Sequence, residues 1–182
     1  MNDPGLPDFR ESAAMNKSEE AKRLGELHGY GVLDSPNETE FDSIVREAAR
    51  ELGAPIALIS LIDENRQWFK AKVGLEPSET PRSISFCTHA IQGSEVFEIS
   101  DAREDSRFAD NPLVTGDPNI RFYAGAPLRT SSGRRIGTLC VIDNRTRPRL
   151  SPEQTAILTE LADKTMEALE RRKVRRARFS AA

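Results

Sequence analysis

The chain has 182 residues, of which 37% are hydrophobic and 30% are charged, and its formal net charge is −3. This length suits one domain with a substantial core and is short for two. No apolar run approaches the roughly 20 residues that cross a membrane, and the N-terminus lacks the layout of a signal peptide. Two cysteines, Cys87 and Cys140, are too few for a disulfide framework. We therefore expect a cytoplasmic protein that does not enter a membrane.

Charge is distributed unevenly along the chain. Residues 171–182 carry six basic and no acidic side chains, so the part before them is clearly acidic. An acidic domain argues against a nucleic-acid-binding face. Cations also stabilise the C-terminal end of a helix. We therefore interpret residues 171–182 as a basic, solvated C-terminal tail rather than as a lipid or nucleic-acid site.

The first third of the chain predicts an arm and two helices. Prolines, a glycine and scattered polar residues predict a disordered arm over residues 1–16. A helical pattern follows over residues 17–29, and a second helix has one continuous apolar face over residues 41–52. We expect Asn37 to cap the start of the second helix and Gly53 to end it.

Two strands should follow the second helix. Residues 55–62 are almost entirely apolar, which favours a strand in the centre of a sheet. After a short turn, residues 67–73 alternate in character, which predicts Phe69, Ala71 and Val73 on one face of the strand. A short turn between two strands requires that they run antiparallel.

Residues 74–120 have a mixed composition that predicts a loop-rich insert. We expect one or two helical turns at residues 86–91, a short strand at residues 96–99 and an extended loop at residues 101–119. Loops longer than about a dozen residues in a compact domain are usually functional or disordered. The insert is therefore the first place to look for a binding site.

A second hairpin and a long helix complete the chain. Strands at residues 122–128 and 136–142 are joined by a turn that contains Gly133. Gly125 and Gly137 lie inside these strands, where glycine indicates the close approach of another group, either a terminal helix or a ligand. Beyond them, a capping box at residues 151–154 begins the last helix, which has an apolar stripe over residues 157–169. The order of elements predicts an α+β fold: a central antiparallel sheet has the N- and C-terminal helices on one face, and the insert roofs a pocket on the other.

Four segments of the chain resemble GAF domains in order and spacing. They are FDSIVREAARELGAPIALISLIDENRQWFKAKVGL, SISFCTHAI, ISDAREDSRFADNPLV and IRFYAGAPLRTSSGRRIGTLCVID. The similarity covers about residues 24–169 and is of the type found at the N-terminus of bacterial sensor histidine kinases and cyclic-dinucleotide enzymes. It implies a PAS-like fold in one GAF domain over residues 17–170. Family members bind cyclic nucleotides, bilins, haem or small metabolites, and many mediate dimerisation.

The resemblance implies a sensory module of signal transduction that binds a small ligand or a protein partner and does not catalyse a reaction. It leaves the ligand and any cofactor unspecified. No kinase, cyclase or phosphodiesterase segment follows Leu169, so we expect a stand-alone module that acts through a partner such as a sensor kinase or a cyclic-dinucleotide enzyme. The terminal helices can pair across a two-fold axis, which predicts a homodimer. A dimerisation module with a filled pocket is an alternative.

Cys87, Thr88 and His89 are the most reactive group of residues in the sequence. A thiol and an imidazole at the start of a short helix can form a reactive pair, with Cys140 as a second thiol. The simpler interpretation is a small, buried and inert cysteine. Cys87 also resembles a position of the GAF reductases of free methionine sulfoxide, so a thiol-based reductase is an alternative function, although residues 101–119 contain no cysteine. Thr88 argues against covalent bilin attachment, and the spacing matches no zinc signature, so we expect no metal.

The candidate ligand contacts come from the insert and the strand that follows it. Charges alternate along residues 101–119, where Arg107 or Asp110 is a candidate contact; the alternative is a solvated loop whose charges pair with one another. Arg121 and Tyr123 share one face of their strand. The candidate pocket residues are Phe86, Cys87, His89, Asp101, Arg107, Phe108, Asp110, Arg121 and Tyr123.

Overall fold

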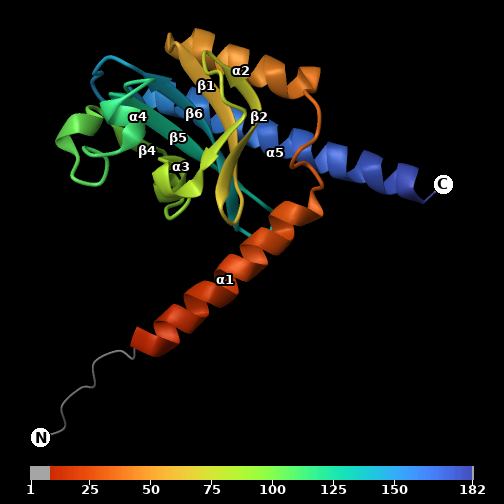
Figure 1. The fold of residues 1–182 in the computed structure, drawn as a ribbon. Helices are drawn as coiled ribbons and strands as arrows, with labels where there is room; N and C mark the ends of the chain where they lie inside the picture. Colours follow the sequence, from red (N-terminus) through yellow and green to blue (C-terminus); the bar gives the residue numbers. More distant parts are fainter. Residues whose placement is uncertain (1–8, 182) are drawn as a thin grey trace, which may run out of the picture.

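A six-stranded antiparallel sheet forms the centre of the molecule, with long helices on one face and short elements and loops on the other (Figure 1). The computed structural model describes residues 9–181, with side chains from residue 16 onward. The elements in chain order are α1 (Phe9–Gly29), α2 (Thr39–Leu52), β1 (Ile56–Ile62), β2 (Arg66–Val73), β3 (Glu79–Pro81), η1 (Arg82–Ile84), α3 (Cys87–Ala90), β4 (Phe97–Ile99), η2 (Ala102–Glu104), α4 (Pro112–Thr115), β5 (Phe122–Arg129), β6 (Arg135–Asp143) and α5 (Pro152–Ser180).

The strand order confirms the predicted α+β architecture. The strands lie in the order β3-β2-β1-β6-β5-β4, and every neighbouring pair is antiparallel. β1 and β6 form the middle of the sheet, and every residue of β1 is buried, as its continuous apolar sequence predicted. The sheet therefore joins the two hairpins of the sequence along their inner strands.

Helices α2 and α5 cover one face of the sheet. The apolar face of α2 is buried at every expected turn, and Gly53 ends the helix with φ +56°, as predicted. The N-terminal cap differs, because the residue before the helix is Glu38 rather than Asn37 and its side chain caps nothing. The Glu38 carboxylate instead accepts hydrogen bonds from Lys70 and Arg172.

Helix α5 begins with the predicted capping box and is longer than the sequence pattern indicated. Ser151 and Gln154 exchange side-chain and backbone hydrogen bonds, and the helix continues to Ser180, so the basic tail is its last part. In Figure 1 this end extends beyond the sheet. Helix α1 begins at Phe9, eight residues before its predicted start at Lys17; the part of the predicted arm before Phe9 lies outside the described residues. Among residues 9–181, no helix combines the length and apolar character that crossing a bilayer requires.

A bulge in β2 overturns the simple alternation predicted for this strand. Ile59 of β1 pairs with Ala71, but the next residue, Ser60, pairs with Phe69, which leaves Lys70 as an extra residue. As a result Phe69 packs on the roof side while Ala71 packs on the helix side. The predicted common face for Phe69, Ala71 and Val73 is therefore wrong for Phe69, because one extra residue reverses the alternation.

Different groups approach the two glycines that lie inside strands, and neither group belongs to a helix. A Cβ atom on Gly137 would lie 2.0 Å from the carbonyl oxygen of Ser60 on the neighbouring strand. A Cβ atom on Gly125 would lie 2.3 Å from the hydroxyl of Tyr123, whose ring lies over this strand. The close approach predicted at both glycines thus comes from the backbone of β1 and from an aromatic side chain.

The insert between β2 and β5 forms the roof over the second face of the sheet. It contains β3, α3, β4 and α4, all four residues or shorter. A second apolar layer lies between the roof and the sheet, separate from the layer beneath the long helices. The predicted insert thus has two short α-helices, two short 3-10 helices (η1 and η2) and two short strands, and it positions the site described next.

Candidate ligand-binding site

A cavity of about 320 Å³ lies between the sheet and the roof. This volume is at the small end of the range for ligand sites, roughly 300–1,000 Å³. Strands β1, β2, β5 and β6 form its floor, and the roof elements form its walls. The lining residues are Leu58, Gln67, Phe69, Gly74, Leu75, Glu76, Pro77, Thr80, Phe86, Cys87, Leu113, Asp117, Pro118, Ile120, Tyr123 and Ile142.

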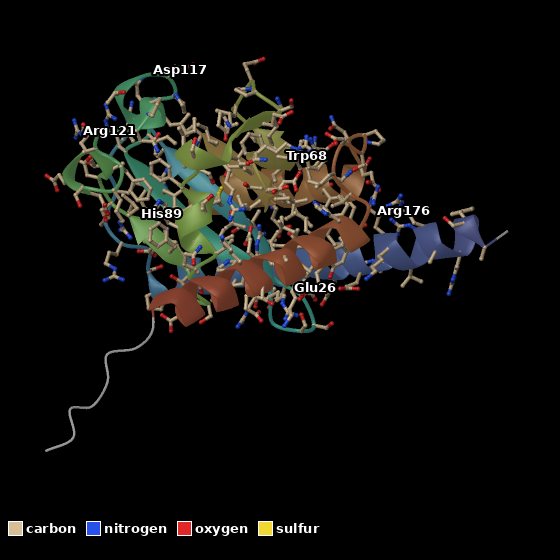
Figure 2. The ribbon with its side chains drawn as sticks, turned by 60° about the horizontal axis from the view of Figure 1, so that its bottom comes forward. Glu26, Trp68, His89, Asp117, Arg121 and Arg176 are labelled. Atoms are coloured by element: carbon tan, nitrogen blue, oxygen red, sulfur yellow. The ribbon has the colours of Figure 1, made fainter. Side chains whose placement is uncertain are left out.

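The lining is mostly apolar, and none of the described residues that form it is basic. Aliphatic and aromatic groups form the floor, while the carboxylates of Glu76 and Asp117 belong to exposed residues of the roof. Figure 2 shows Asp117 and Arg121 on the roof side of the molecule. The Arg121 guanidinium does not line the cavity, because it donates to the carbonyl oxygens of Val114 and Ile120 at 2.9 and 3.1 Å. The site therefore presents negative rather than positive charge to a ligand.

A buried network of polar groups lies beneath one end of the cavity. The Gln67 side-chain oxygen accepts hydrogen bonds from the hydroxyls of Ser60 and Ser85, at 2.8 and 3.0 Å. The Gln67 amide nitrogen donates to Thr80 Oγ1 at 3.0 Å. Since a polar group removed from water needs partners, these bonds hold Gln67 in one orientation and fix the polar part of the cavity wall.

Three side chains surround the sulfur of Cys87. Tyr123 Oη and Thr138 Oγ1 each lie 3.1 Å from Cys87 Sγ, and Cys140 Sγ lies 4.0 Å away. Burial opposes ionisation of Cys87, but hydrogen bonds from Cys140, Thr138 and Tyr123 outweigh it and lower its pKa to about 7. Burial and the neighbouring Cys87 raise the pKa values of Cys140 and Tyr123. The cluster thus favours one thiolate, on Cys87.

Three of the predicted pocket residues line the cavity, and two others support them from behind. Phe86, Cys87 and Tyr123 belong to the lining. Phe108 is buried and stacks on Phe86 with ring centroids 4.1 Å apart, and the His89 ring packs edge-on against Phe108 at 4.8 Å. Burial and the charge of Arg107 lower the pKa of His89, which keeps its ring neutral at this apolar contact.

The remaining predicted residues lie outside the cavity lining. Asp101 accepts bonds from Arg103 at 3.0 and 2.8 Å, and Asp105 accepts bonds from Arg107 at 3.0 and 2.7 Å. Asp110 is exposed. These charges therefore pair within the roof loop, as the solvated-loop interpretation expected, and Arg121 fastens α4 to the start of β5.

Sequence reasoning missed most of the apolar lining. The missed aliphatic and aromatic residues are Leu58, Phe69, Leu75, Leu113, Ile120 and Ile142. The alternation of β1 and β6 would have found Leu58 and Ile142, because each shares a strand face with residues of the roof-side layer. Phe69 was missed because the bulge reverses the side-chain alternation of β2. The roof residues were missed because their segments have no periodic pattern.

Other hollows on the surface have charged groups in their lining. A hollow of about 510 Å³ beside β2 and α2 includes Asp34, Asp42, Arg46 and Lys72 in its lining. Among the described residues, no group of three or more His, Cys, Asp and Glu side chains is placed to hold a metal ion. The cavity beneath the roof is therefore the better candidate for binding a small molecule.

Most of the chain matches a known protein family and part of a curated relative. The family model described as GAF domain matches residues 36–169. A cyclic di-GMP phosphodiesterase of Pseudomonas aeruginosa is 46% identical over 144 residues, which are 79% of this chain and 24% of that protein. The chain thus spans about a quarter of the length of this curated relative.

Solved structures share the fold at low sequence identity. The GAF domain of a phosphoenolpyruvate-protein phosphotransferase from Acinetobacter has a TM-score of 0.62 and 20% identity, over 86% of this chain and 93% of that one. A type II free methionine-R-sulfoxide reductase from Thermoplasma acidophilum has a TM-score of 0.60 and 14% identity, over 73% of this chain and 92% of that one. At these identities the likeness concerns the fold alone.

Proposed function

Because the chain belongs to the GAF domain family, we propose that it is a regulatory module that binds a small ligand in the cavity beneath the roof, without catalysis. The observation that carries this proposal is the cavity itself, which lies between a buried sheet face and the insert and has a mostly apolar lining. A domain that only needed to fold or dimerise would gain stability by filling this space with side chains. The cavity therefore favours a ligand-binding sensor over a dimerisation module whose pocket is filled with side chains.

The lining defines the chemical class of the ligand. Aromatic and aliphatic walls favour a compact apolar group, and Gln67 and Thr80 supply polar atoms at one end. In the part of the chain that the structure describes, the lining includes Glu76 and Asp117 but no Arg or Lys. A phosphate group would meet no cation there, and its charge would be opposed by both carboxylates. The ligand is therefore an uncharged or cationic metabolite rather than a nucleotide.

The predicted site residues divide into two roles in this proposal. Phe86, Cys87 and Tyr123 contact the ligand, and Phe108 and His89 hold Phe86 in place. The remaining predicted residues, Asp101, Arg107, Asp110 and Arg121, shape the roof and its outer surface. Binding orders the roof and shifts the population of its conformations.

Arg147 offers a physical route from the roof to the helices. Its backbone N–H donates to Ser100 beside β4 at 3.4 Å, and its guanidinium donates to the carbonyl oxygens of Leu52 and Gly53 at the end of α2. It also bonds Asp143 at the end of β6, at 2.8 Å. A change in the roof near β4 is thereby coupled to the end of α2.

The proposal includes an output through other proteins or domains. The Pseudomonas aeruginosa relative supports a cyclic-dinucleotide enzyme as partner; a sensor kinase is the other candidate, and the setting that we propose for both is the cytoplasm. Within the domain, the buried stripe of α5 is already used by packing on the sheet. Homodimerisation through the terminal helices would therefore use the extended end of α5, where Val174 and Phe179 are exposed.

Thermal unfolding with a panel of metabolites tests the ligand class. Uncharged and cationic aromatic compounds should raise the melting temperature of the wild-type chain, whereas cyclic nucleotides and cyclic di-GMP should not. Leu113→Trp, which places an indole in the cavity, should abolish the shift; Leu33→Trp, a matched change of a half-buried leucine packed on the helix-side layer, should keep it. Stabilisation only by phosphate-bearing compounds, or equal shifts in Leu113→Trp, would overturn the proposed site.

Sedimentation equilibrium tests the homodimer separately. The wild-type chain should sediment as a dimer, and a Val174→Ser/Phe179→Ser variant should dissociate because its exposed apolar groups on α5 are removed. A wild-type chain that stays monomeric at high concentration would remove dimerisation from the proposal and leave ligand binding unaffected.

A reductase function has no comparable support. Residues 101–119 contain no cysteine, and the likeness to the Thermoplasma acidophilum enzyme is a likeness of fold at 14% identity.

A further inference from the structure

The two cysteines of the chain are brought together from distant parts of the sequence. Cys87 is the first residue of α3 in the roof, and Cys140 lies in the central strand β6. Both thiols are free and buried, and their sulfur atoms lie 4.0 Å apart. A disulfide has an S–S length of about 2.05 Å, so a relative movement of about 2 Å would bring the two sulfurs to bonding distance.

The groups around Cys87 are arranged to stabilise a negative charge on its sulfur. The hydroxyls of Tyr123 and Thr138 lie 3.1 Å from this sulfur, and both donate to it. The Tyr123 ring can lie over β5 only because residue 125 is glycine. Two neutral donors at one sulfur favour the thiolate, and the lowered pKa of Cys87 agrees with this geometry.

The two cysteines differ in access. Cys87 belongs to the lining of the cavity, whereas Cys140 does not. A small uncharged molecule that enters the cavity therefore meets Cys87 first, and Cys140 lies behind it. This order matches a pair in which one thiolate reacts with an oxidant and the second thiol resolves the product.

We propose that Cys87 is a modification site for hydrogen peroxide and that Cys140 resolves the oxidised cysteine by forming a disulfide. This activity is separate from the ligand binding proposed above. The substrate class is a small, uncharged hydroperoxide, because the apolar lining and its two carboxylates admit a neutral molecule more readily than an anion.

The chemistry balances with peroxide as the only oxidant. The Cys87 thiolate attacks one peroxide oxygen, the O–O bond breaks, and the departing hydroxide takes a proton to become water, which leaves Cys87 as a sulfenic acid. The Cys140 sulfur then attacks the Cys87 sulfur, the S–O bond breaks and the S–S bond forms. The hydroxide that leaves in this second step takes the Cys140 proton as water. Two thiols lose two electrons in total, and one peroxide becomes two waters.

The disulfide would change the cavity. The central strand holds Cys140 through pairing with both β1 and β5, whereas α3 has only four residues. The approach of the sulfurs therefore moves α3 toward the sheet, and with it Phe86, which precedes the helix and forms part of the cavity wall. Oxidation then makes the cavity smaller.

Mass analysis of the purified, reduced chain after treatment with hydrogen peroxide tests the proposal. The wild-type chain should lose two hydrogens, yield a Cys87–Cys140 peptide and recover fully with dithiothreitol. Cys140→Ser should stop at a Cys87 sulfenic acid that dimedone traps, and Cys87→Ser should leave Cys140 unmodified. An unmodified wild-type chain in excess peroxide, or oxidation of Cys140 in Cys87→Ser at the wild-type rate, would overturn the proposal.

The rate of oxidation by hydrogen peroxide distinguishes an activated Cys87 thiolate from a thiol that reacts because it is exposed or because the chain has unfolded. Tyr123→Phe keeps the ring and removes one donor, so oxidation near pH 7 should slow, by about fivefold if the thiol pKa rises by one unit from its value of about 7. Leu113→Trp should slow oxidation by blocking the cavity, and Leu33→Trp should not. Equal rates in all four chains would contradict both the activation and the route. Ligand-induced stabilisation of the reduced wild-type chain would leave the binding proposal standing even if oxidation failed.

Discussion

Gly125 and Gly137 both indicate a close approach to a strand, but the group that approaches differs between them. At Gly137 an added methyl group would meet the carbonyl oxygen of Ser60, at 2.0 Å, in the backbone of a central strand. At Gly125 it would meet the hydroxyl of Tyr123, at 2.3 Å. A paired backbone cannot move away without breaking the sheet, whereas a side chain can tilt.

Alanine substitutions should therefore differ in cost. We expect Gly137→Ala to lower the free energy of unfolding by about 3 kcal/mol, at the upper end of overpacking effects, and Gly125→Ala by about 1–2 kcal/mol. Urea denaturation measures both. Gly125→Ala should also raise the thiol pKa of Cys87, because the displaced Tyr123 hydroxyl no longer donates to the sulfur. Equal costs for the two variants would show that the contact at Gly137 relaxes as easily as a side chain.

The thiol cluster should make stability depend on pH with a definite sign. The ordinary thiol pKa is about 8.5, and in the folded chain the pKa of Cys87 is about 7. Between these values the unfolded chain holds a proton that the folded chain has released, so the free energy of unfolding rises with pH. This contribution is complete above about pH 8.5 and is lost as the pH falls through about 7. The raised pKa of Cys140 acts above pH 8.5, where it lowers stability.

Urea denaturation of the reduced chain between pH 7 and 8.5 checks this prediction. The wild-type chain should gain stability across the interval, and Cys87→Ser should lose that gain. The interval lies above the range in which His89 titrates, because the pKa of His89 is lowered from an ordinary value near 6.5. A rise that persists in Cys87→Ser would assign it to another group.

At the scale of elements, the bulge in β2 creates a buried charge network that joins three segments. Lys70 is 1% exposed, and its ammonium donates to Ser35 Oγ at 2.8 Å, to the Pro36 carbonyl at 2.7 Å and to Glu38 at 2.5 Å. Glu38 also accepts a bond from Arg172 of α5 at 2.7 Å. Burial lowers the pKa of Lys70, and Glu38 opposes that effect. The network therefore ties the loop before α2 to β2 and to α5.

Neutralising Glu38 should lower the free energy of unfolding more than replacing the buried Lys70 ammonium with an apolar group. Glu38→Gln leaves Lys70 buried without a counter-charge, and we expect a loss of up to about 3 kcal/mol, below the range for fully buried pairs because Glu38 is partly exposed. Lys70→Met replaces the ammonium with an apolar side chain of similar length and should cost about 1 kcal/mol. Thermal unfolding compares them, and a larger loss in Lys70→Met would show that Lys70 acts mainly through its bonds to Ser35 and Pro36.

Elements with a strong periodic signal could be predicted from the sequence, and the exceptions have local causes. The α2 face and the capping box of α5 follow directly from residue spacing, because each depends on neighbours within one turn or two. The extra residue at Lys70 could not be predicted, since it depends on the pairing of β2 with β1. Cys87 and Tyr123 were proposed from their chemistry, and both line the cavity together with Phe86, which was also proposed. The apolar roof residues were missed because they come from irregular segments that meet only in the folded chain.

At the scale of the whole molecule, the sheet separates two apolar layers with different roles. The layer beneath α2 and α5 is filled by side chains, whereas the layer beneath the roof encloses a cavity of about 320 Å³. Helix α5 extends beyond the sheet at its basic end, as Arg176 in Figure 2 illustrates, and it is held to residues 30–31 by hydrogen bonds from Arg172 and Arg176. A filled layer beneath the helices and a cavity beneath the roof suit the proposed module, which binds a ligand on the roof side of the sheet and passes the change to a partner through the helices on the other side.

Native mass spectrometry of the chain purified from a bacterial cytoplasm tests ligand binding in the cavity most directly. We predict that the wild-type chain and Leu33→Trp carry a bound small molecule as additional mass, which is released on unfolding, and that Leu113→Trp has the mass of the bare chain. The same bare mass for all three chains, or the same additional mass in Leu113→Trp as in the wild type, would contradict ligand binding beneath the roof.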